Sequence, residues 1–215
     1  MRIAKEAWPF VLPFAAAAVV LAFTAGIGWA LAAAVAGLGV MLFFRDPPRA
    51  FDGDPDWVVA AADGLVTGVD TVEDPAMGGG RCRRVVTFLS AFDVHVQRTP
   101  TDGEVVASSF ASGRKVAAFR ADAGEVNESH TTVIRRRDGD LVGVRQIVGL
   151  MARRVVCYLR PGQQVARGQH LGIIKFGSRV DLLVPESYEV LVKKGDRVRN
   201  GATPMARPRS ADGDR

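Results

Sequence analysis

The strongest constraint on this chain is an N-terminal stretch, residues 8–44, that contains no charged residue. Such a run is too long for an ordinary helix of a water-soluble domain, and also too long for the apolar core of a signal peptide. The sequence that follows it, RDPP at residues 45–48, does not resemble a small-residue cleavage site. The stretch therefore predicts a segment that stays on the protein and associates with a membrane.

The run is short for two complete spans of about 20 residues each. Gly26 and Gly28 lie near its middle, where a turn can form. Basic residues flank both ends, as is typical of cytoplasmic flanks. We therefore expect a tight helical hairpin over residues 1–46 that anchors the protein to the cytoplasmic face of the cell membrane. A single long span is the alternative, and the sequence does not decide whether the hairpin crosses the bilayer or dips into it.

The composition changes after the hairpin. Residues 47–56 are rich in proline and aspartate and predict a linker, because proline ends a helix. Residues 57–206 are long enough for one domain with its own core. Residues 207–215 are polar and charged and predict a disordered tail.

Short runs rich in valine and isoleucine, bounded by turn residues, predict a mainly β domain built as a compact sandwich or barrel. Asp-Gly pairs at residues 63–64, 102–103 and 138–139 predict tight turns. Residues 146–153 fit a helical turn and a continued strand equally well. The runs that predict strands are residues 57–60, 85–89, 141–144, 155–159 and 171–174.

A weak internal repeat supports this interpretation. ADGLV at residues 62–66 resembles TDGEV at residues 101–105, and PGQQVARG at 161–168 resembles KGDRVRNG at 194–201. The second pair shares the pattern G-x-x-V-x-x-G, in which glycines make the turns and the valine points inward. Such hairpins are similar to those of lipoyl- and biotinyl-type sandwiches.

The net charge of +5 and the pI of about 9.7 suit an anionic partner. Because the hairpin already predicts a membrane, we expect a phospholipid surface and no nucleic acid. The arginines at residues 135–137 and 153–154 are candidates for headgroup contacts, although solvated turns explain them more simply. Cys82 and Cys157 are far apart in sequence and predict structural thiols in a reducing compartment.

Common catalytic motifs are missing from the sequence. The three histidines are widely separated, so we expect no metal site. There is no nucleotide-binding loop, and Ser178 is not in a G-x-S-x-G elbow. Conventional hydrolase and nucleotide-binding functions are therefore poorly supported.

One segment carries a more specific signal. GIIKFGSRVD, residues 172–181, places Gly177 and Ser178 on a turn between two apolar runs. It resembles the self-cleavage region of the short bacterial and archaeal form of phosphatidylserine decarboxylase. AADGLV at residues 61–66, FLSAFDVHVQRTP at 88–100 and NE at 127–128 resemble further family segments in the same order. The resemblance thus covers nearly the whole chain.

The resemblance implies a self-processing carboxy-lyase that converts phosphatidylserine to phosphatidylethanolamine and carbon dioxide. Ser178 would attack the carbonyl of Gly177, the chain would break between residues 177 and 178, and Ser178 would become a pyruvoyl group. That group would be the cofactor, and the two cleavage chains would remain together as a heterodimer. The sequence leaves assembly into a homo-oligomer open, and it identifies no residue that binds the headgroup.

Serine is a weak nucleophile and needs a base. By resemblance, Asp63 and His95 are the candidates to activate or orient Ser178. The longer form of the family has a second histidine three positions after the first, whereas this chain has Arg98 there. His95 matches the first histidine, which is linked more naturally to decarboxylation, so its part in self-cleavage is an open question.

A non-enzymatic, membrane-anchored adaptor with a lipoyl-like sandwich is the alternative function. The glycine-rich hairpins fit it, but the long heptad helices typical of such adaptors are not in the sequence. Lys175 precedes Phe176 and does not fit the modified lysine of a lipoyl or biotinyl carrier. A sandwich-type metallopeptidase is poorer still, for want of histidine ligands.

Overall fold

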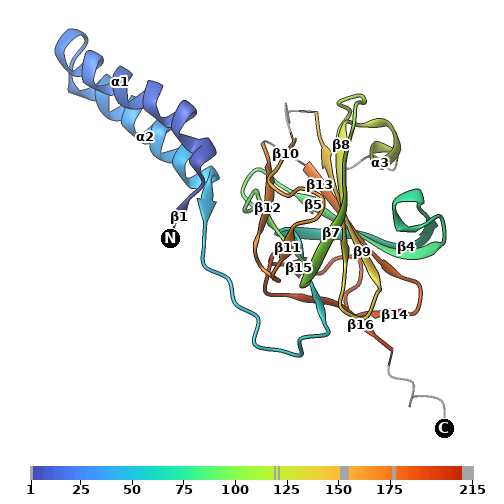
Figure 1. Cartoon of the computed structure of the whole chain (residues 1–215). Coiled ribbons are helices and arrows are strands. Elements are labelled where there is room, and N and C mark those ends of the chain that lie inside the picture. Colours follow the sequence, from blue (N-terminus) through green and yellow to red (C-terminus); the bar gives the residue numbers. More distant parts are fainter. Residues whose placement is uncertain (1, 119, 121, 151–154, 176–177, 210–215) are drawn as a thin grey trace. The chain divides into compact units, whose positions relative to one another are not determined.

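The computed structural model describes residues 2–118, 120, 122–150, 155–175 and 178–209. The chain divides into two compact units, Met1–Pro48 and Arg49–Arg215, and each is described here by itself (Figure 1).

The first unit is a helical hairpin. Helices α1 (Trp8–Thr24) and α2 (Ile27–Phe43) are joined at Gly26, whose φ of +96° favours glycine. A 3-10 turn, η1 (Lys5–Ala7), precedes α1. Short strands β1 (Arg2–Ile3) and β2 (Arg45–Asp46) pair antiparallel and bring the two ends together. The expected hairpin is confirmed, with both basic ends on the same side of it, and a single long helix is excluded.

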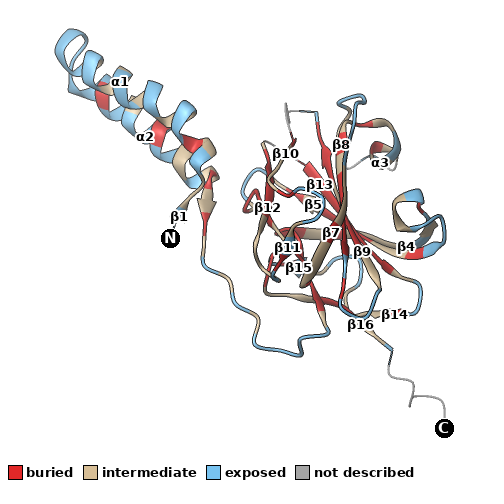
Figure 2. Ribbon diagram, in the orientation of Figure 1, coloured by how far each residue is buried: buried red, intermediate tan, exposed pale blue. Residues whose placement is uncertain are grey.

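The outer surface of the hairpin is apolar. Gly37 lets the helices approach closely, since a Cβ there would lie 3.0 Å from the Cβ of Phe14. Large side chains such as Phe23 and Ile27 are exposed, and much of the hairpin's ribbon is pale blue in Figure 2. The helical segment Lys5–Thr24 has a mean hydropathy of 1.9 and is long enough to cross a membrane, while Ile27–Phe43 is shorter. The hairpin thus has the composition of a membrane anchor.

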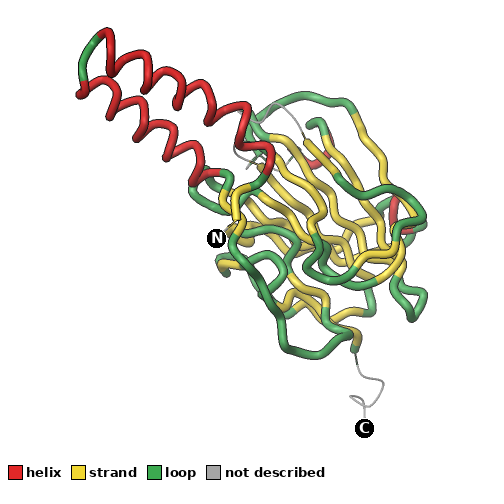
Figure 3. Tube along the Cα trace, turned by 60° about the vertical axis from the view of Figure 1, so that its left-hand side comes forward, coloured by secondary structure: helices red, strands yellow, loops and turns green. Residues whose placement is uncertain are grey.

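The second unit is mainly β, as expected. Its largest sheet has eight antiparallel strands in the order β11-β7-β8-β9-β13-β5-β4-β15 and is curled, as Figure 3 shows. Two three-stranded sheets, β10-β12-β6 and β14-β16-β3, pack with it. The strands are β3 (Val58–Val59), β4 (Gly64–Glu73), β5 (Arg81–Leu89), β6 (Val96–Arg98), β7 (Gly103–Ala111), β8 (Ser129–Arg135), β9 (Leu141–Val148), β10 (Val155–Cys157), β11 (Gln164–Val165), β12 (His170–Ile174), β13 (Ser178–Pro185), β14 (Tyr188–Val190), β15 (Arg197–Val198) and β16 (Pro204–Pro208); the short helices are η2 (Pro75–Met77) and α3 (Ala123–Val126).

Each of the five runs that predicted strands contains a strand, although β3 covers only Val58–Val59 of residues 57–60 and β10 only Val155–Cys157 of residues 155–159. Strand β9 continues to Val148, so the first three residues of the ambiguous stretch 146–153 form a strand and not a helical turn. Residues 151–154 lie outside the described residues. Strand β16 extends to Pro208, two residues past the boundary expected for the folded domain. Cys82 and Cys157 are free thiols.

The internal repeat is a structural one. The strand order of the large sheet reads the same from both ends when β4, β5, β13 and β15 are equated with β7, β8, β9 and β11. Val198 pairs with Gly64 in one half as Val165 pairs with Gly103 in the other. Both valines are buried, which confirms their inward orientation. The domain is therefore built from two halves related by an approximate twofold axis between β9 and β13.

The two Asp-Gly turns have the same hydrogen bonds. The Oδ1 of Asp63 accepts the backbone N–H of Asn200 at 2.8 Å, and the Oδ1 of Asp102 accepts that of Arg167 at 2.8 Å. At the glycine after each aspartate, a Cβ would lie 2.2 Å from a carbonyl oxygen of the neighbouring strand. Each half therefore needs both residues of its Asp-Gly pair.

The repeat also equates the residues that precede Arg179 and Leu141. Arg179 of β13 pairs with Phe88, as Leu141 of β9 pairs with Arg135. Asp140 thus occupies the place in one half that Ser178 occupies in the other. Of these two residues, only Ser178 offers a hydroxyl group.

Candidate active site

Ser178 lies at the middle of one end of the large sheet. It is the first residue of β13 and pairs with Leu89 on one side and Val148 on the other. Val148 ends β9, Leu89 ends β5, and on the outer strands the same end is formed by Ser129 of β8 and Ala111 of β7. We call this end of the sheet the Ser178 rim.

Asp63 belongs to the same rim. Leu65 of β4 pairs with Phe88, so Asp63, two residues earlier, lies beyond the end of β4 on the Ser178 side. One strand, β5, separates β4 from β13, which places the two backbones about 10 Å apart. The structure thus brings Asp63 and Ser178, which are far apart in sequence, to one end of the sheet.

The hydroxyl of Ser178 is fully buried, with 0 % of the residue exposed. Among the described residues, its Oγ has no hydrogen-bond partner. Leaving a buried polar group unpaired costs on the order of 1–3 kcal/mol, and such groups in native proteins call for a functional explanation. The Ser178 hydroxyl is expected to attack the carbonyl of Gly177. Gly177 and Phe176 lie outside the described residues.

His95 is buried directly before β6, which pairs with β12, the strand that precedes Ser178 in the chain. Its backbone carbonyl accepts the N–H of Ile174, the last residue of β12, at 3.4 Å. The ring Nδ1 is 2.9 Å from the carbonyl oxygen of Asp93. Because a carbonyl only accepts, Nδ1 carries the proton, and in the neutral ring Nε2 has the lone pair. His95 is therefore held in the tautomer that a general base requires.

Two residues that the sequence did not single out hold Asp63. Arg49 forms an ion pair with it, with Nη2 at 2.7 Å from Oδ2. Asn200 donates its backbone N–H to Asp63 and its side-chain Nδ2 to the carbonyl of Val96 at 2.7 Å. Since Val96 follows His95, Asn200 connects the two candidate residues. Arg49 lies in the stretch that the sequence assigns to a linker, and no local motif marks it.

Sequence comparison finds related proteins. A sequence model of the phosphatidylserine decarboxylase family matches residues 38–206. A phosphatidylserine decarboxylase proenzyme of Symbiobacterium thermophilum is 44% identical over 207 residues, which cover 95% of this chain and 95% of that protein. Proenzymes of the same name from Aromatoleum aromaticum and Mycobacteroides abscessus are 40% and 44% identical over 95% and 92% of this chain and 94% and 86% of their own lengths.

The chain belongs to the phosphatidylserine decarboxylase family. The expected resemblance is thereby confirmed, and neither comparison supports a non-enzymatic adaptor. The family is one of carboxy-lyases, and the relatives are named as proenzymes.

In this member of the phosphatidylserine decarboxylase family, Arg98 has a structural contact. Its Nη1 donates to the carbonyl of Gly168 at 2.8 Å, across the loop that leads from β11 to β12. Its side chain also contacts the neighbouring loop, because a Cβ at Gly201 would lie 3.1 Å from its Cδ. A guanidinium does not lose its proton in proteins, so Arg98 cannot serve as the base that a second histidine would supply.

Asn127 holds the strand next to Ser178. Its Nδ2 donates to the carbonyl of Val148 at 2.8 Å, and Val148 is the cross-strand partner of Ser178. The same side chain makes two hydrogen bonds with the backbone of Val116. The sequence marked residues 127–128 only as a family segment; the structure shows that the amide of Asn127 fixes the end of β9.

A buried polar chain supports His95 from within the domain. Gln97 donates to the carbonyl of His95 at 2.8 Å, and Gln146 donates to Gln97 at 2.9 Å. Gly172 makes room for the side chain of Gln146, since a Cβ at residue 172 would lie 2.9 Å from the Nε2 of Gln146 and 2.1 Å from the carbonyl oxygen of Val156. Strand β12 is thereby packed tightly against the residues that position His95.

The other face of β13 carries a buried ion pair directly after Ser178. Arg179 binds Asp181 through two hydrogen bonds of 2.6 and 2.8 Å, and both residues are buried. Burial raises the pKa of the Asp181 carboxyl, although the hydrogen bonds from Arg179 act in the opposite direction. The pair thus anchors the first residues of β13, the strand that begins with the candidate nucleophile Ser178.

Breaking this pair is expected to destabilise the domain. In Asp181→Asn the guanidinium of Arg179 stays buried without a counter-charge, which costs about 3–5 kcal/mol. Urea unfolding in a Ser178→Ala background, which is expected to keep the chain in one piece, measures the difference. The double variant Arg179→Met/Asp181→Leu should lose much less, and a loss below about 1 kcal/mol in Asp181→Asn would contradict the assignment.

Proposed function

We propose that this chain is a self-processing phosphatidylserine decarboxylase that forms phosphatidylethanolamine and carbon dioxide. The observation that carries the proposal is the fully buried Ser178 Oγ at the start of the central strand, in a chain whose relatives are named phosphatidylserine decarboxylase proenzymes. Asp63, also selected by the sequence, lies at the same end of the sheet, and the backbone carbonyl of His95 accepts from Ile174, four residues before Ser178.

Self-processing needs the Ser178 hydroxyl and its neighbour. The Oγ attacks the Gly177 carbonyl carbon, and the peptide C–N bond breaks as the ester forms. Loss of the Ser178 Cα proton then breaks the Cβ–O bond, which leaves a carboxylate on Gly177 and a dehydroalanine at residue 178. Water replaces its nitrogen, ammonia leaves, and a pyruvoyl group remains on the chain that starts at residue 178.

The surroundings of Ser178 fit such a group. A new free amino terminus would place a charge at a buried position, whereas a pyruvoyl cap is neutral and costs far less to bury. The keto group supplies an electron sink next to the carboxylate that the substrate loses. The chain's own residues would hold that end: Ser178 between Leu89 and Val148, and Val148 fixed by Asn127.

We assign His95 to proton transfer and Asp63 to positioning. With its Nδ1 proton directed to the carbonyl of Asp93, His95 accepts or delivers a proton at Nε2. Asp63, paired with Arg49, orients Asn200, which in turn binds the backbone next to His95. Residues 57–206 form the enzyme in this proposal, and residues 1–46 hold it at the cytoplasmic face of the membrane.

His95→Gln separates the two reactions. We expect self-cleavage to continue and decarboxylation to fall by about 10²–10⁴-fold, because a glutamine cannot exchange a proton at the Nε2 position. Gel analysis measures cleavage, and release of carbon dioxide from phosphatidylserine measures turnover. If cleavage stops as well, His95 serves both steps; if turnover is unchanged, its assignment is wrong.

Intact-mass measurement of the purified protein tests the proposal as a whole. We expect two chains, residues 1–177 and a small chain of 38 residues, 178–215, whose N-terminus carries a keto group in place of the amino group. The two should copurify, since β13 pairs with β5 on one side and β9 on the other. An active preparation that contains only the uncut chain would rule the proposal out.

A further inference from the structure

The second unit exposes three large apolar side chains among its described residues, and all three lie at the Ser178 rim. Phe92 is 87% exposed, Leu150 is 70% exposed and Phe110 is 58% exposed. Phe110 is next to the last residue of β7, Leu150 follows the end of β9 by two residues, and Phe92 follows the end of β5 by three. Exposed side chains of this size gathered at one end mark an interaction surface.

The repeat provides an internal comparison. Phe110 on β7 is equivalent to Thr71 on β4. The equivalence holds because the two strands have their bulges at the same point: β7 between Val105 and Ala107, and β4 between Val66 and Gly68. Thr71 is also exposed, but it is small and polar. The fold therefore does not require a large apolar side chain at this position, and only the rim with Ser178 has one.

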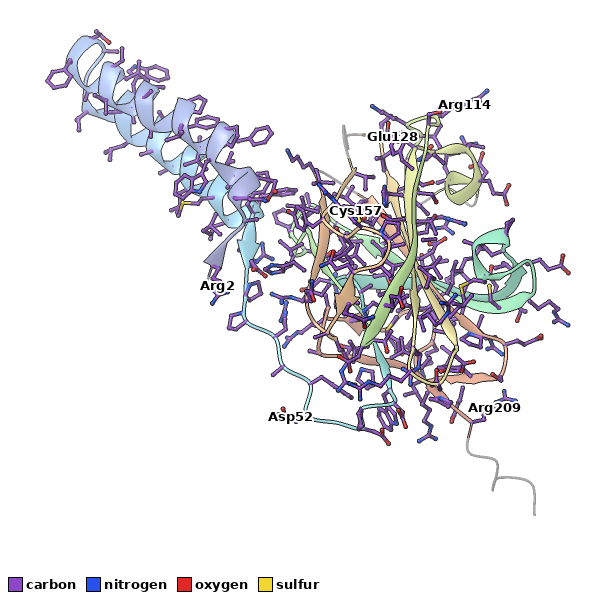
Figure 4. The ribbon with its side chains drawn as sticks, in the orientation of Figure 1. Arg2, Asp52, Arg114, Glu128, Cys157 and Arg209 are labelled. Atoms are coloured by element: carbon purple, nitrogen blue, oxygen red, sulfur yellow. The ribbon has the colours of Figure 1, made fainter. Side chains whose placement is uncertain are left out.

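Basic residues follow Phe110 in the chain. Residues 105–121 include Arg114, Lys115 and Arg120 but no aspartate or glutamate. Arg114 and Lys115 are exposed, and Figure 4 shows Arg114 beside Glu128 at this end of the domain. Two carboxylates lie close to these cations: Asp122 binds Arg120 at 2.9 Å, and the Oε2 of Glu128 is 3.8 Å from the Nζ of Lys115. The segment thus combines an exposed aromatic ring with cations.

The arginine cluster that the sequence suggested for headgroup contacts is not part of this surface. Arg135 ends β8 at the opposite end from Ser129. Arg136 is buried and forms ion pairs with Asp56 and Asp138, so it contacts protein carboxylates instead of lipid. The exposed apolar side chains therefore select the other end of the sheet, whereas Arg135 and Arg137 remain exposed at this one.

We propose that the Ser178 rim docks on an anionic phospholipid bilayer, with Phe92, Phe110 and Leu150 inserted into the interfacial region. Arg114 and Lys115 lie against the headgroups, each such cation near the surface contributing about 1 kcal/mol. Interfacial insertion of a few apolar side chains next to cations is a common mode of peripheral binding. Docking itself stands on the exposed residues, while its purpose, access of Ser178 to a lipid substrate, rests on the proposed function.

Tryptophan substitution tests docking without any need for activity. Phe110→Trp and its matched control Thr71→Trp are prepared in the full chain and reconstituted into anionic vesicles whose acyl chains carry bromine, a contact quencher. The added fluorescence of Phe110→Trp should be quenched at least threefold more than that of Thr71→Trp. Equal quenching at the two positions would overturn the proposal, whether or not the protein is a decarboxylase.

A kinetic test shows what docking does for the reaction. The variant Phe92→Ser/Phe110→Ser/Leu150→Ser should process itself normally but decarboxylate phosphatidylserine in vesicles at least tenfold more slowly than the unchanged chain. On short-chain phosphatidylserine dissolved as monomers, the two should agree within twofold. An equal loss on both substrates, no loss on vesicles, or a changed oligomeric state would contradict bilayer docking. An unchanged chain that is inactive on both substrates would instead refute the proposed function.

Discussion

Replacing Ser178 by alanine is expected to leave one uncut polypeptide of 23.0 kDa with no decarboxylase activity. Both consequences have one cause, since the hydroxyl is the nucleophile for cleavage and the precursor of the electron sink. The fold should survive, because the Oγ is buried without a partner among the described residues and its removal exposes no unsatisfied group. We expect the midpoint of its thermal unfolding to be unchanged or slightly raised relative to the unsubstituted chain before cleavage.

Ser129→Ala is the matched control. Ser129 is also a buried serine at the Ser178 rim, at the start of β8. This variant should be cut and should be active, which shows that loss of a rim serine alone does not stop the reaction. Denaturing gels and carbon dioxide release give both readouts. A cleaved or active Ser178→Ala protein would remove Ser178 from the mechanism.

Asp63→Asn is expected to slow self-cleavage by at least 100-fold. The asparagine keeps an oxygen for the N–H of Asn200 but no longer neutralises Arg49, whose guanidinium is 2.7 Å away. The partly buried arginine must then find another acceptor, and the connection from Asp63 through Asn200 to Val96, the neighbour of His95, is disturbed. A loss of this size is what misplacing an acid–base group costs.

Asp102→Asn isolates the structural part of that effect. Asp102 makes the same hydrogen bond in the other half of the repeat, to the N–H of Arg167, and lies at the opposite end of the sheet. It should be processed at a normal rate. A time course of cleavage in freshly refolded protein compares the two variants. Equal rates would mean that Asp63 only makes a turn.

The sequence predicted the local structure well because its signals are local. Valine-rich runs, Asp-Gly turns and the G-x-x-V-x-x-G hairpins each depend on a few consecutive residues, and the fold keeps all of them. The sequence could not predict which residues lie at the same end of the sheet. Whether Asp63 or Asp102 shares a rim with Ser178 depends on strand order, and both aspartates sit in nearly the same sequence context.

The residues that support the site could not be predicted from the sequence either. Arg49 lies in a stretch that reads as a linker, and Asn200 lies in a turn whose pattern is fully explained by its glycines. Their contacts join positions 14 and 137 residues apart in the chain, so no spacing rule connects them. His95, by contrast, was found because its neighbouring residues carry the family pattern.

The position of β13 has a consequence for the life of the protein after cleavage. The strand that begins at Ser178 lies between β5 and β9, in the centre of the large sheet. Before cleavage it enters that place as part of one continuous chain, so folding is unimolecular. Afterwards, an unfolded molecule must recapture a separate short peptide, and the refolding rate becomes concentration-dependent. The cut enzyme should therefore persist through a slow unfolding rate, while only the precursor returns readily from the unfolded state.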